Sequence, residues 1–144
     1  MKIKLTFILI LTICTIQMSF GQYELKITKS ENDILIKTLN NSRLIAENRK
    51  NYLSVRIYKI HNGSGSAGFP EGHEVSHNLL ITVSGFDENP YQSLFEIGPF
   101  YNPKFKKWKD LKEYDKSFEV EYGIYSNRKT LKLKVNINEL KMEK

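Results

Sequence analysis

The sequence predicts a mostly β protein, an antiparallel sandwich of about seven strands with one short helix, preceded by a signal peptide. Two observations lead to this prediction. After residue 22, apolar and polar residues alternate with a period of two over several stretches, as they do in strands with one buried face. Before residue 22, an apolar run follows two lysines, which is typical of a segment that directs export.

The N-terminal segment contains each part of a signal peptide. Lys2 and Lys4 precede the apolar run 5–16, which is shorter than the ~20 residues that a membrane-spanning helix needs. Ser19 and Gly21 are the small residues that a cleavage site requires. We therefore expect residues 1–21 to be removed and residues 22–144 to form a single β-sandwich-like domain, secreted or periplasmic, with no membrane span after processing. A retained membrane anchor is the less favoured alternative.

Charge and cysteine content narrow the class of protein further. Removing Lys2 and Lys4 lowers the net charge from +6 to +4, a weakly basic value that does not indicate a nucleic-acid partner. Cys14 is the only cysteine and would leave with the signal peptide. The mature domain therefore has no disulfide, and an ordinary apolar core must hold it together. Nothing in the pattern favours a particular oligomeric state.

Residues 23–97 predict five strands and one loop. Residues 23–39 favour a hairpin, because their first half alternates in polarity and a polar turn separates it from a second apolar run. Residues 40–51 are mostly polar and indicate a loop or a single helical turn. Alternation predicts further strands at residues 53–60 and 79–83 and a short one at 94–97.

The C-terminal part predicts a second hairpin, in which residues 118–125 pair with 130–137. If Ser126 lies opposite Lys129, the apolar side chains of both strands fall on one face of the hairpin. This register pairs Ile124 with Leu131 and continues to Phe118 opposite Ile137, with Val120 opposite Val135 and Tyr122 opposite Leu133, while Glu121 lies across from Lys134 on the other face.

One short helix is predicted near residues 103–114. Asn102 is a good N-cap, and Pro103 suits the first position of a helix. Apolar residues then recur every third position, as in a short α-helix or 3₁₀ segment. These residues are Phe105, Trp108, Leu111 and Tyr114.

His73, Glu74 and His77 match the H-E-x-x-H pattern of zinc hydrolases. That pattern requires a helix, which places both histidines one turn apart with the glutamate beside the metal-bound water. Here Pro70 precedes the motif and the β-rich residues 79–83 follow it. An extended segment would separate the two histidines by about 13 Å, too far to share one ion. We therefore predict no catalytic residue, no metal ligand and no cofactor.

Two metal sites remain as alternatives. The first is a small zinc-dependent hydrolase with His73 and His77 as zinc ligands and Glu74 as general base. The second is a non-catalytic metal site that adds His61 to the same two histidines.

The glycine-rich residues 63–68 spell G-x-G-x-x-G after a predicted strand. No helix begins there, because Pro70 follows, so we reject a dinucleotide site. Residues 61–77 are better interpreted as one long connection, which either binds a partner or is a disordered excursion.

Aromatic residues are concentrated in one part of the chain, where 11 of the 17 fall between residues 86 and 125. Phe100, Tyr101, Phe105 and Trp108 are the candidate ligand-binding residues, since aromatic rings stack on sugars and anchor protein interfaces. The alternative is that these rings fill the core. The sequence thus predicts an exported, non-catalytic binding domain with a protein or glycan as ligand.

Overall fold

The computed structural model describes residues 27–68, 74–88, 90–109, 114–124 and 126–143. The predicted signal peptide, residues 1–21, lies outside them. The chain divides into the units Met1–Glu31 and Asn32–Lys144. The second unit contains the helix and the strands described below. Among the described residues, no helix combines the length and the apolar character needed to cross a membrane.

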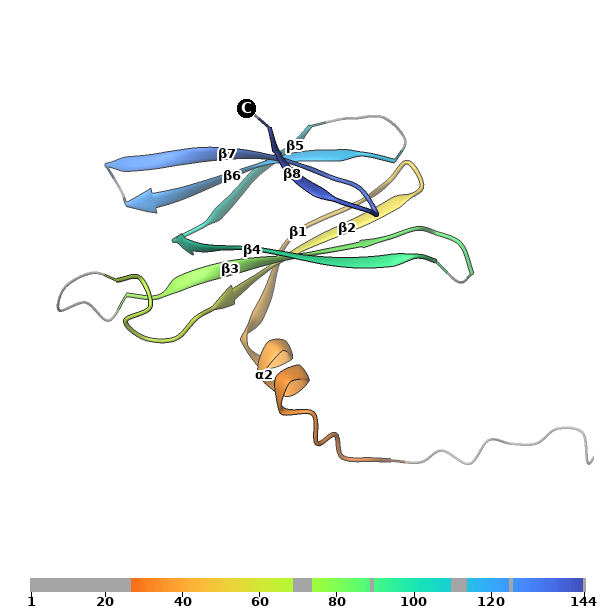
Figure 1. Cartoon of the computed structure of the whole chain (residues 1–144), viewed down its shortest axis with the longest axis horizontal. Coiled ribbons are helices and arrows are strands. Elements are labelled where there is room, and N and C mark those ends of the chain that lie inside the picture. The colour runs from red at the N-terminus through yellow and green to blue at the C-terminus, as the bar shows by residue number, and fades with distance from the viewer. Residues whose placement is uncertain (1–26, 69–73, 89, 110–113, 125, 144) are drawn as a thin grey trace, which may run out of the picture. The chain divides into compact units, whose positions relative to one another are not determined.

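Asn32–Lys144 contains two four-stranded antiparallel sheets, which confirms the prediction of a mostly β protein. In each sheet the strands follow one another in chain order, as a meander, and the two sheets lie face to face (Figure 1). The first sheet contains β1 (Ser42–Lys50), β2 (Leu53–His61), β3 (Ser76–Ser84) and β4 (Gln92–Tyr101). The second contains β5 (Lys104–Lys109), β6 (Lys116–Ile124), β7 (Asn127–Val135) and β8 (Leu140–Glu143).

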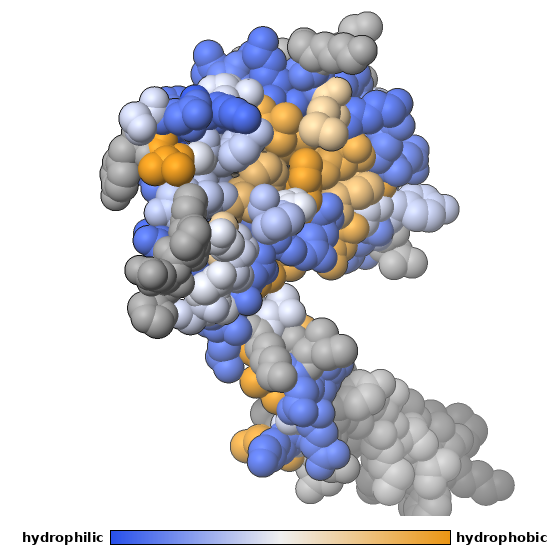
Figure 2. All heavy atoms as spheres, turned by 60° about the vertical axis from the view of Figure 1, so that its left-hand side comes forward, coloured by the Kyte–Doolittle hydropathy of each residue, from blue (hydrophilic) through white to orange (hydrophobic). Residues whose placement is uncertain are grey.

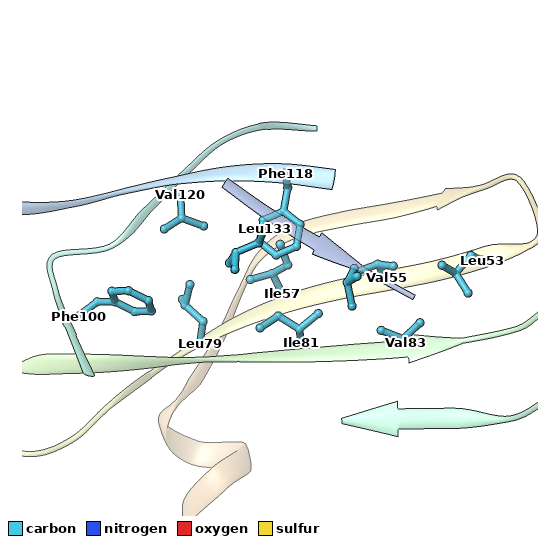
Figure 3. Close-up of a cluster of buried hydrophobic side chains, with 11 residues drawn as sticks. Leu53, Val55, Ile57, Leu79, Ile81, Val83, Phe100, Phe118, Val120 and Leu133 are labelled. Atoms are coloured by element: carbon cyan, nitrogen blue, oxygen red, sulfur yellow. The ribbon is translucent and has the colours of Figure 1, made fainter. Parts of the chain in front are cut away.

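The core lies between the two sheets and consists of alternate side chains of the inner strands, together with Phe100 of the outer strand β4. Figure 3 shows the side chains of β2 and β3 on one side, and those of β6 and β7 opposite them. Each fully buried Val, Leu, Ile or Phe contributes about 1.5–3 kcal/mol, which is how a small domain without a disulfide is held together. The buried set is Leu53, Val55, Ile57, Leu79, Ile81, Val83, Phe100, Phe118, Val120, Leu133 and Val135.

The meander order places the connections alternately at the two ends of the sandwich (Figure 1). The β1–β2, β3–β4, β5–β6 and β7–β8 connections lie at one end, which we call the cleft end. The β2–β3, β4–β5 and β6–β7 connections lie at the other, which we call the loop end. Loops positioned by a rigid sandwich are common places for binding residues.

The helix predicted near residues 103–114 is wrong over residues 104–109, which form β5. Residues 110–113 lie outside the described part. A bulge between Phe105 and Lys107 explains the misleading spacing of three. It inserts one extra residue, so Phe105 and Trp108 both face the core, opposite Val120 and Phe118.

The hairpin predicted for residues 23–39 is wrong over residues 33–39, which belong to the helix α2 (Asp33–Asn41). The capping residues at the N-terminus of this segment favour a helix more strongly than its short apolar run favours a strand. The Oδ1 atom of Asn32 accepts a hydrogen bond from the backbone N–H of Leu35 at 3.0 Å, and Asp33 lies in the first turn. Residues 23–26 of that prediction lie outside the described residues.

The loop predicted for residues 40–51 is also wrong, because Ser42–Lys50 forms β1. This strand is polar since it lies at the edge of its sheet and only Ile45 and Ala46 pack against the core. A bulge between Leu44 and Ala46 further breaks the alternation that would have revealed it. The strands predicted at 53–60, 79–83 and 94–97 are confirmed as parts of β2, β3 and β4.

The C-terminal hairpin is confirmed as β6 and β7, but its predicted register is wrong by four residues. Phe118 pairs with Leu133 rather than Ile137, and Ile124 pairs with Asn127 across a two-residue connection. A shift by an even number of residues leaves every side chain on the same face. The apolar pattern therefore could not distinguish the two registers.

Candidate functional site

A cleft of about 350 Å³ opens at the cleft end of the sandwich. Its lining draws on all four connections of that end, so residues far apart in the chain meet at one place. The lining residues are Tyr52, Leu53, Gly85, Phe86, Asp87, Tyr91, Tyr114, Asp115, Asn136, Ile137 and Asn138.

Four aromatic side chains of this cleft are exposed to solvent. Tyr91 is 88% exposed, Tyr52 and Tyr114 are 64% exposed, and Phe86 is 47% exposed. Burying an aromatic ring on folding contributes several kcal/mol to stability. Because these rings remain largely in contact with solvent, each contributes less than a fully buried ring would. The three tyrosines, which are mostly exposed, therefore contribute little to stability, and all four rings have surface available to a ligand.

Tyr52 occupies a backbone conformation that disfavours a large side chain. Asn51 and Tyr52 form the two-residue turn between β1 and β2, with φ angles of 51° and 59°. Such a turn prefers glycine at its second position, and a bulky residue there costs of the order of 1 kcal/mol. A strained aromatic residue beside a cleft is the kind of outlier that points to a function.

A buried lysine holds this turn against the second sheet. Lys116, which is only 3% exposed, begins β6 in that sheet. Its Nζ atom donates a hydrogen bond to the backbone carbonyl oxygen of Lys50 at 2.8 Å, directly before the turn. The contact fixes the position of Tyr52 relative to the residues of the second sheet across the cleft.

The polar side of the cleft is ordered by a hydrogen-bond network. The Nδ2 atom of Asn136 donates to Oδ1 of Asp115 at 3.2 Å, and the Nζ atom of Lys134 lies 3.0 Å from Oδ2 of the same carboxylate. The Oδ1 atom of Asn136 accepts from the backbone N–H groups of Asn138 and Glu139 at 2.9 and 3.0 Å. The cleft thus has a rigid polar wall beside its aromatic rings.

The four aromatic residues predicted to bind a ligand lie elsewhere. Phe100 is 7% exposed and belongs to the core, where its ring centroid lies 5.0 Å from that of Tyr122. Phe105 and Trp108 lie 5.1 Å apart, and both rings pack near Phe118. Tyr101 is half-buried at the end of β4. Three of the four therefore contribute to the core.

The H-E-x-x-H motif falls partly outside the described residues, which do not include His73. Glu74 is exposed and lies before β3, while His77 lies within β3. The segment from Glu74 to His77 is therefore not helical. His77 instead pairs across the sheet with His61 in β2. The described part of the chain contains no group of three potential metal ligands.

His77 lies in a setting that disfavours its protonated form. Burial lowers the pKa of His77 below its ordinary value, and the positive charge of Lys59 and the neighbouring His61 lower the pKa further. Among the described residues, its Nδ1 atom is buried and has no hydrogen-bond partner. A neutral imidazole is therefore favoured at this position in the folded protein.

At the loop end, the polar side chain of Arg128 forms hydrogen bonds within the protein that hold neighbouring segments together. The guanidinium group of Arg128 donates to the backbone carbonyl oxygens of Gly123, Asn102 and Glu121 at 3.0–3.2 Å. Its Nε atom also lies 3.1 Å from the carboxylate of Glu121. This side chain ties the β4–β5 connection to β6 and β7, which is a structural role.

Local sequence patterns did not predict Tyr52, Phe86, Tyr91 and Tyr114 as candidate site residues. Turns favour Gly, Asn, Asp, Ser and Pro, so an aromatic residue in a turn contradicts the local preference. Such contradictions are expected at functional sites, and an aromatic side chain beside Asn51 or Gly85 was the available signal.

Fold and cleft together define the class of this protein as a two-sheet antiparallel β-sandwich with an aromatic cleft at one end. Comparison with protein-family models, with curated proteins and with solved structures finds no match for the chain.

Proposed function

We propose that this protein is an exported, non-catalytic carbohydrate-binding domain, and that the cleft of Tyr52, Phe86, Tyr91 and Tyr114 is its ligand site. One observation carries the proposal. Four exposed aromatic rings from separate parts of the chain surround a single cleft that also contains carboxylate and amide groups.

This combination suits a sugar ring. The C–H groups on one face of a sugar pack on an aromatic ring, while its hydroxyl groups need hydrogen-bond donors and acceptors nearby. The carboxylate oxygens of Asp87 and Asp115 can accept from hydroxyl groups, and the amide of Asn138 can donate or accept. The location of these groups in connections rather than strands is typical of binding sites on sandwich scaffolds.

The sequence supports export and thereby the carbohydrate class. Residues 1–21 have the pattern of a signal peptide, and polysaccharides are abundant outside the cytoplasm. The zinc-hydrolase alternative lacks its required context, because the described residues of its motif include the strand β3 and no helix.

The proposal is tested by measuring binding of cellohexaose, xylohexaose, mannohexaose and chitohexaose to the purified protein by isothermal titration calorimetry. We expect at least one of the four to bind, and Tyr91→Ala to weaken that binding at least tenfold. Tyr91→Phe keeps the ring and should retain binding within about threefold. Failure of all four sugars to bind would contradict the proposal.

A matched control variant distinguishes the cleft from the predicted aromatic residues. Tyr101→Ala removes a half-buried tyrosine ring at the loop end, outside the cleft. We expect Tyr101→Ala to leave the affinity unchanged within about twofold. If Tyr101→Ala weakens binding and Tyr91→Ala does not, the ligand site lies at the loop end instead.

A further inference from the structure

The inward-facing row of side chains on β2 changes from apolar to basic at the loop end. The first three residues of this row belong to the core, but the next two are Lys59 and His61. Figure 2 turns the loop end toward the reader and shows a hydrophobic area between the two sheets with hydrophilic residues around it. The basic residues of β2 therefore lie where the apolar core ends.

The neighbouring strands add two more basic residues on the same face. Lys59 lies opposite Arg43 of β1, and His61 lies opposite His77 of β3. Directly opposite residues of an antiparallel sheet project from one face, and residues two apart along a strand are separated by about 7 Å on that face. We call Arg43, Lys59, His61 and His77 the basic cluster.

The two histidines of the basic cluster form a close cross-strand pair. The backbone N–H of Asn62 donates a hydrogen bond to the carbonyl oxygen of Ser76 at 3.0 Å, so these two opposite residues form a hydrogen-bonded pair. The next pair, His61 and His77, is therefore of the non-hydrogen-bonded type, in which the Cα atoms are only about 4.5 Å apart. Both imidazole rings are thus close enough to contact one small ligand.

The other pair of the cluster places two positive charges opposite each other, an arrangement that destabilises a sheet. In the same hairpin, Arg56 lies opposite Glu47, and its Nε atom is 2.8 Å from the carboxylate. Among the described residues, neither Arg43 nor Lys59 forms an ion pair of this kind. The repulsion between them is therefore not compensated within the described part of the chain.

A second like-charge pair in the protein provides a comparison. Lys134 of β7 lies opposite Lys141 of β8. Each of these lysines has its own carboxylate, because the Nζ atom of Lys134 lies 3.0 Å from Asp115 and that of Lys141 lies 2.7 Å from Glu139. The basic cluster lacks such partners among the described residues. A local arrangement that costs stability without compensation is expected at functional sites.

We propose that the basic cluster binds an oxyanion, a sulfate or phosphate group, at the end of the sandwich opposite to the cleft. The oxygen atoms of such a group accept hydrogen bonds from guanidinium, ammonium and imidazole groups at the same time. The planar guanidinium group of Arg43 suits this role, because it can donate two parallel hydrogen bonds to one anion. The negative charge replaces the repulsion between Arg43 and Lys59 by two attractive contacts.

The charges around the two histidines favour an anion over a metal ion. A pair of imidazole rings can bind Zn²⁺, but Arg43 and Lys59 repel a divalent cation on the same face. Zinc sites in proteins also use three or four side-chain ligands, and the described residues contain no group of three potential ligands.

His77 should report the bound anion through its pKa. The groups that face it are His61 and Lys59 of β2, with Arg43 beyond them, and the uncharged Phe100 of β4. In the free protein, burial lowers the pKa of His77, and Lys59 and His61 lower it further. A negative charge beside the imidazole favours its protonated form, so anion binding should raise this pKa. By linkage, the affinity for the anion should increase as the pH falls.

An NMR titration of the protein with sodium sulfate and with sodium phosphate, at constant ionic strength, tests the proposal. We expect at least one of the two ions to bind, and Lys59→Gln to weaken that binding at least tenfold. Lys141→Gln is the matched control, since it removes one lysine from the other like-charge pair. Its affinity for the ion should stay within about twofold of the wild-type value.

Two esters distinguish a free ion from a group carried on a sugar. Glucose 6-sulfate and glucose 6-phosphate present the same oxyanions in a larger molecule. An ester that binds at least tenfold more tightly than the inorganic ion would assign the cluster to a sulfated or phosphorylated sugar. Equal affinities would assign it to the free ion.

The pKa of His77 provides the second measurement, from its imidazole NMR signal assigned with His77→Gln. We expect saturation with the bound ion to raise this pKa by about half a pH unit or more in the wild-type protein, and not in Lys59→Gln. Failure of both inorganic ions to bind, an unchanged pKa at saturation, or equal losses of affinity in Lys59→Gln and Lys141→Gln would overturn the proposal. Stabilisation by Zn²⁺ that His61→Ala and His77→Ala each abolish would assign the two histidines to a metal site and also overturn it.

Discussion

The two ends of the sandwich use their large and polar side chains in opposite ways. At the loop end, the ring of Phe100 is buried and Arg128 bonds to three backbone carbonyl oxygens. At the cleft end, Tyr91 and Tyr114 are mostly exposed, and Tyr52 is held in a strained turn. Side chains at the first end stabilise the fold, whereas those at the second remain available to a ligand.

The difference follows from how the connections are arranged. The β4–β5 connection passes from one sheet to the other at the loop end, so its residues must pack between the sheets. The four connections of the cleft end each return within one sheet, and most of their described side chains lie outside the core, with Ile137 as an exception. The cleft end is therefore the better place for a binding site.

Truncating a buried ring at the loop end should give the largest loss of stability. Phe100→Ala removes a core side chain that packs against Tyr122, and we expect it to lower the free energy of unfolding by about 3–5 kcal/mol. Urea unfolding followed by circular dichroism measures this loss. A change below about 1 kcal/mol would show that the loop end does not depend on its aromatic residues.

Removing the arginine of the loop end should have the next largest effect. Arg128→Ala leaves three backbone carbonyl oxygens without their donor, and we expect a loss of about 2 kcal/mol in the free energy of unfolding. Lys129→Ala, at the exposed next position of β7, is the matched control and should change stability by less than about 0.5 kcal/mol. Equal effects of both variants would contradict the structural role of Arg128.

At the cleft end, one substitution should increase stability while it weakens binding. Tyr52→Gly relieves the positive φ angle of the turn, so we expect a gain of about 1 kcal/mol in the free energy of unfolding. It also removes one aromatic ring from the cleft, and oligosaccharide affinity should fall. Thermal unfolding and calorimetry on the same sample measure both quantities. A loss of stability would show that the ring of Tyr52 contributes to the fold.

The smallest predicted effect is a pH dependence of the melting temperature, caused by His77 at the loop end. Because the pKa of His77 is lowered in the folded protein, the unfolded state binds a proton more readily. The melting temperature should therefore fall as pH decreases below about 6.5, the ordinary pKa of histidine, and level off below the lowered pKa of the folded state. His77→Gln should reduce this dependence between pH 7 and pH 5. An unchanged dependence would exclude His77 as its source.

Sequence patterns predicted the strands of the core well and the edges poorly. β2, β3 and β6 bury alternate residues, so their period of two is visible. β1 and β5 each contain a bulge at the edge of a sheet, and the extra residue turned a strand pattern into the spacing of a loop or a helix. A bulge is decided by the neighbouring strand, and that information is not local in the sequence.

The candidate site could not be predicted for a related reason. Tyr52, Phe86 and Tyr114 lie in three different connections, and only the stacking of two meanders brings them to one end. Conversely, Phe100, Phe105 and Trp108 are close in the sequence, yet they pack in or against the core because β4 and β5 turn them inward. Aromatic density along the chain therefore does not reveal which rings are exposed.

We infer that the exposed aromatic rings of the cleft end contribute little to the stability of the fold. The sharpest test is the free energy of unfolding of the double variant Tyr91→Ala/Tyr114→Ala, measured by urea unfolding. Because both side chains are mostly exposed, we expect a value within about 1 kcal/mol of the wild-type protein. A loss of about 3 kcal/mol or more would show that these rings are part of the core and would contradict the assignment of the cleft as a binding site.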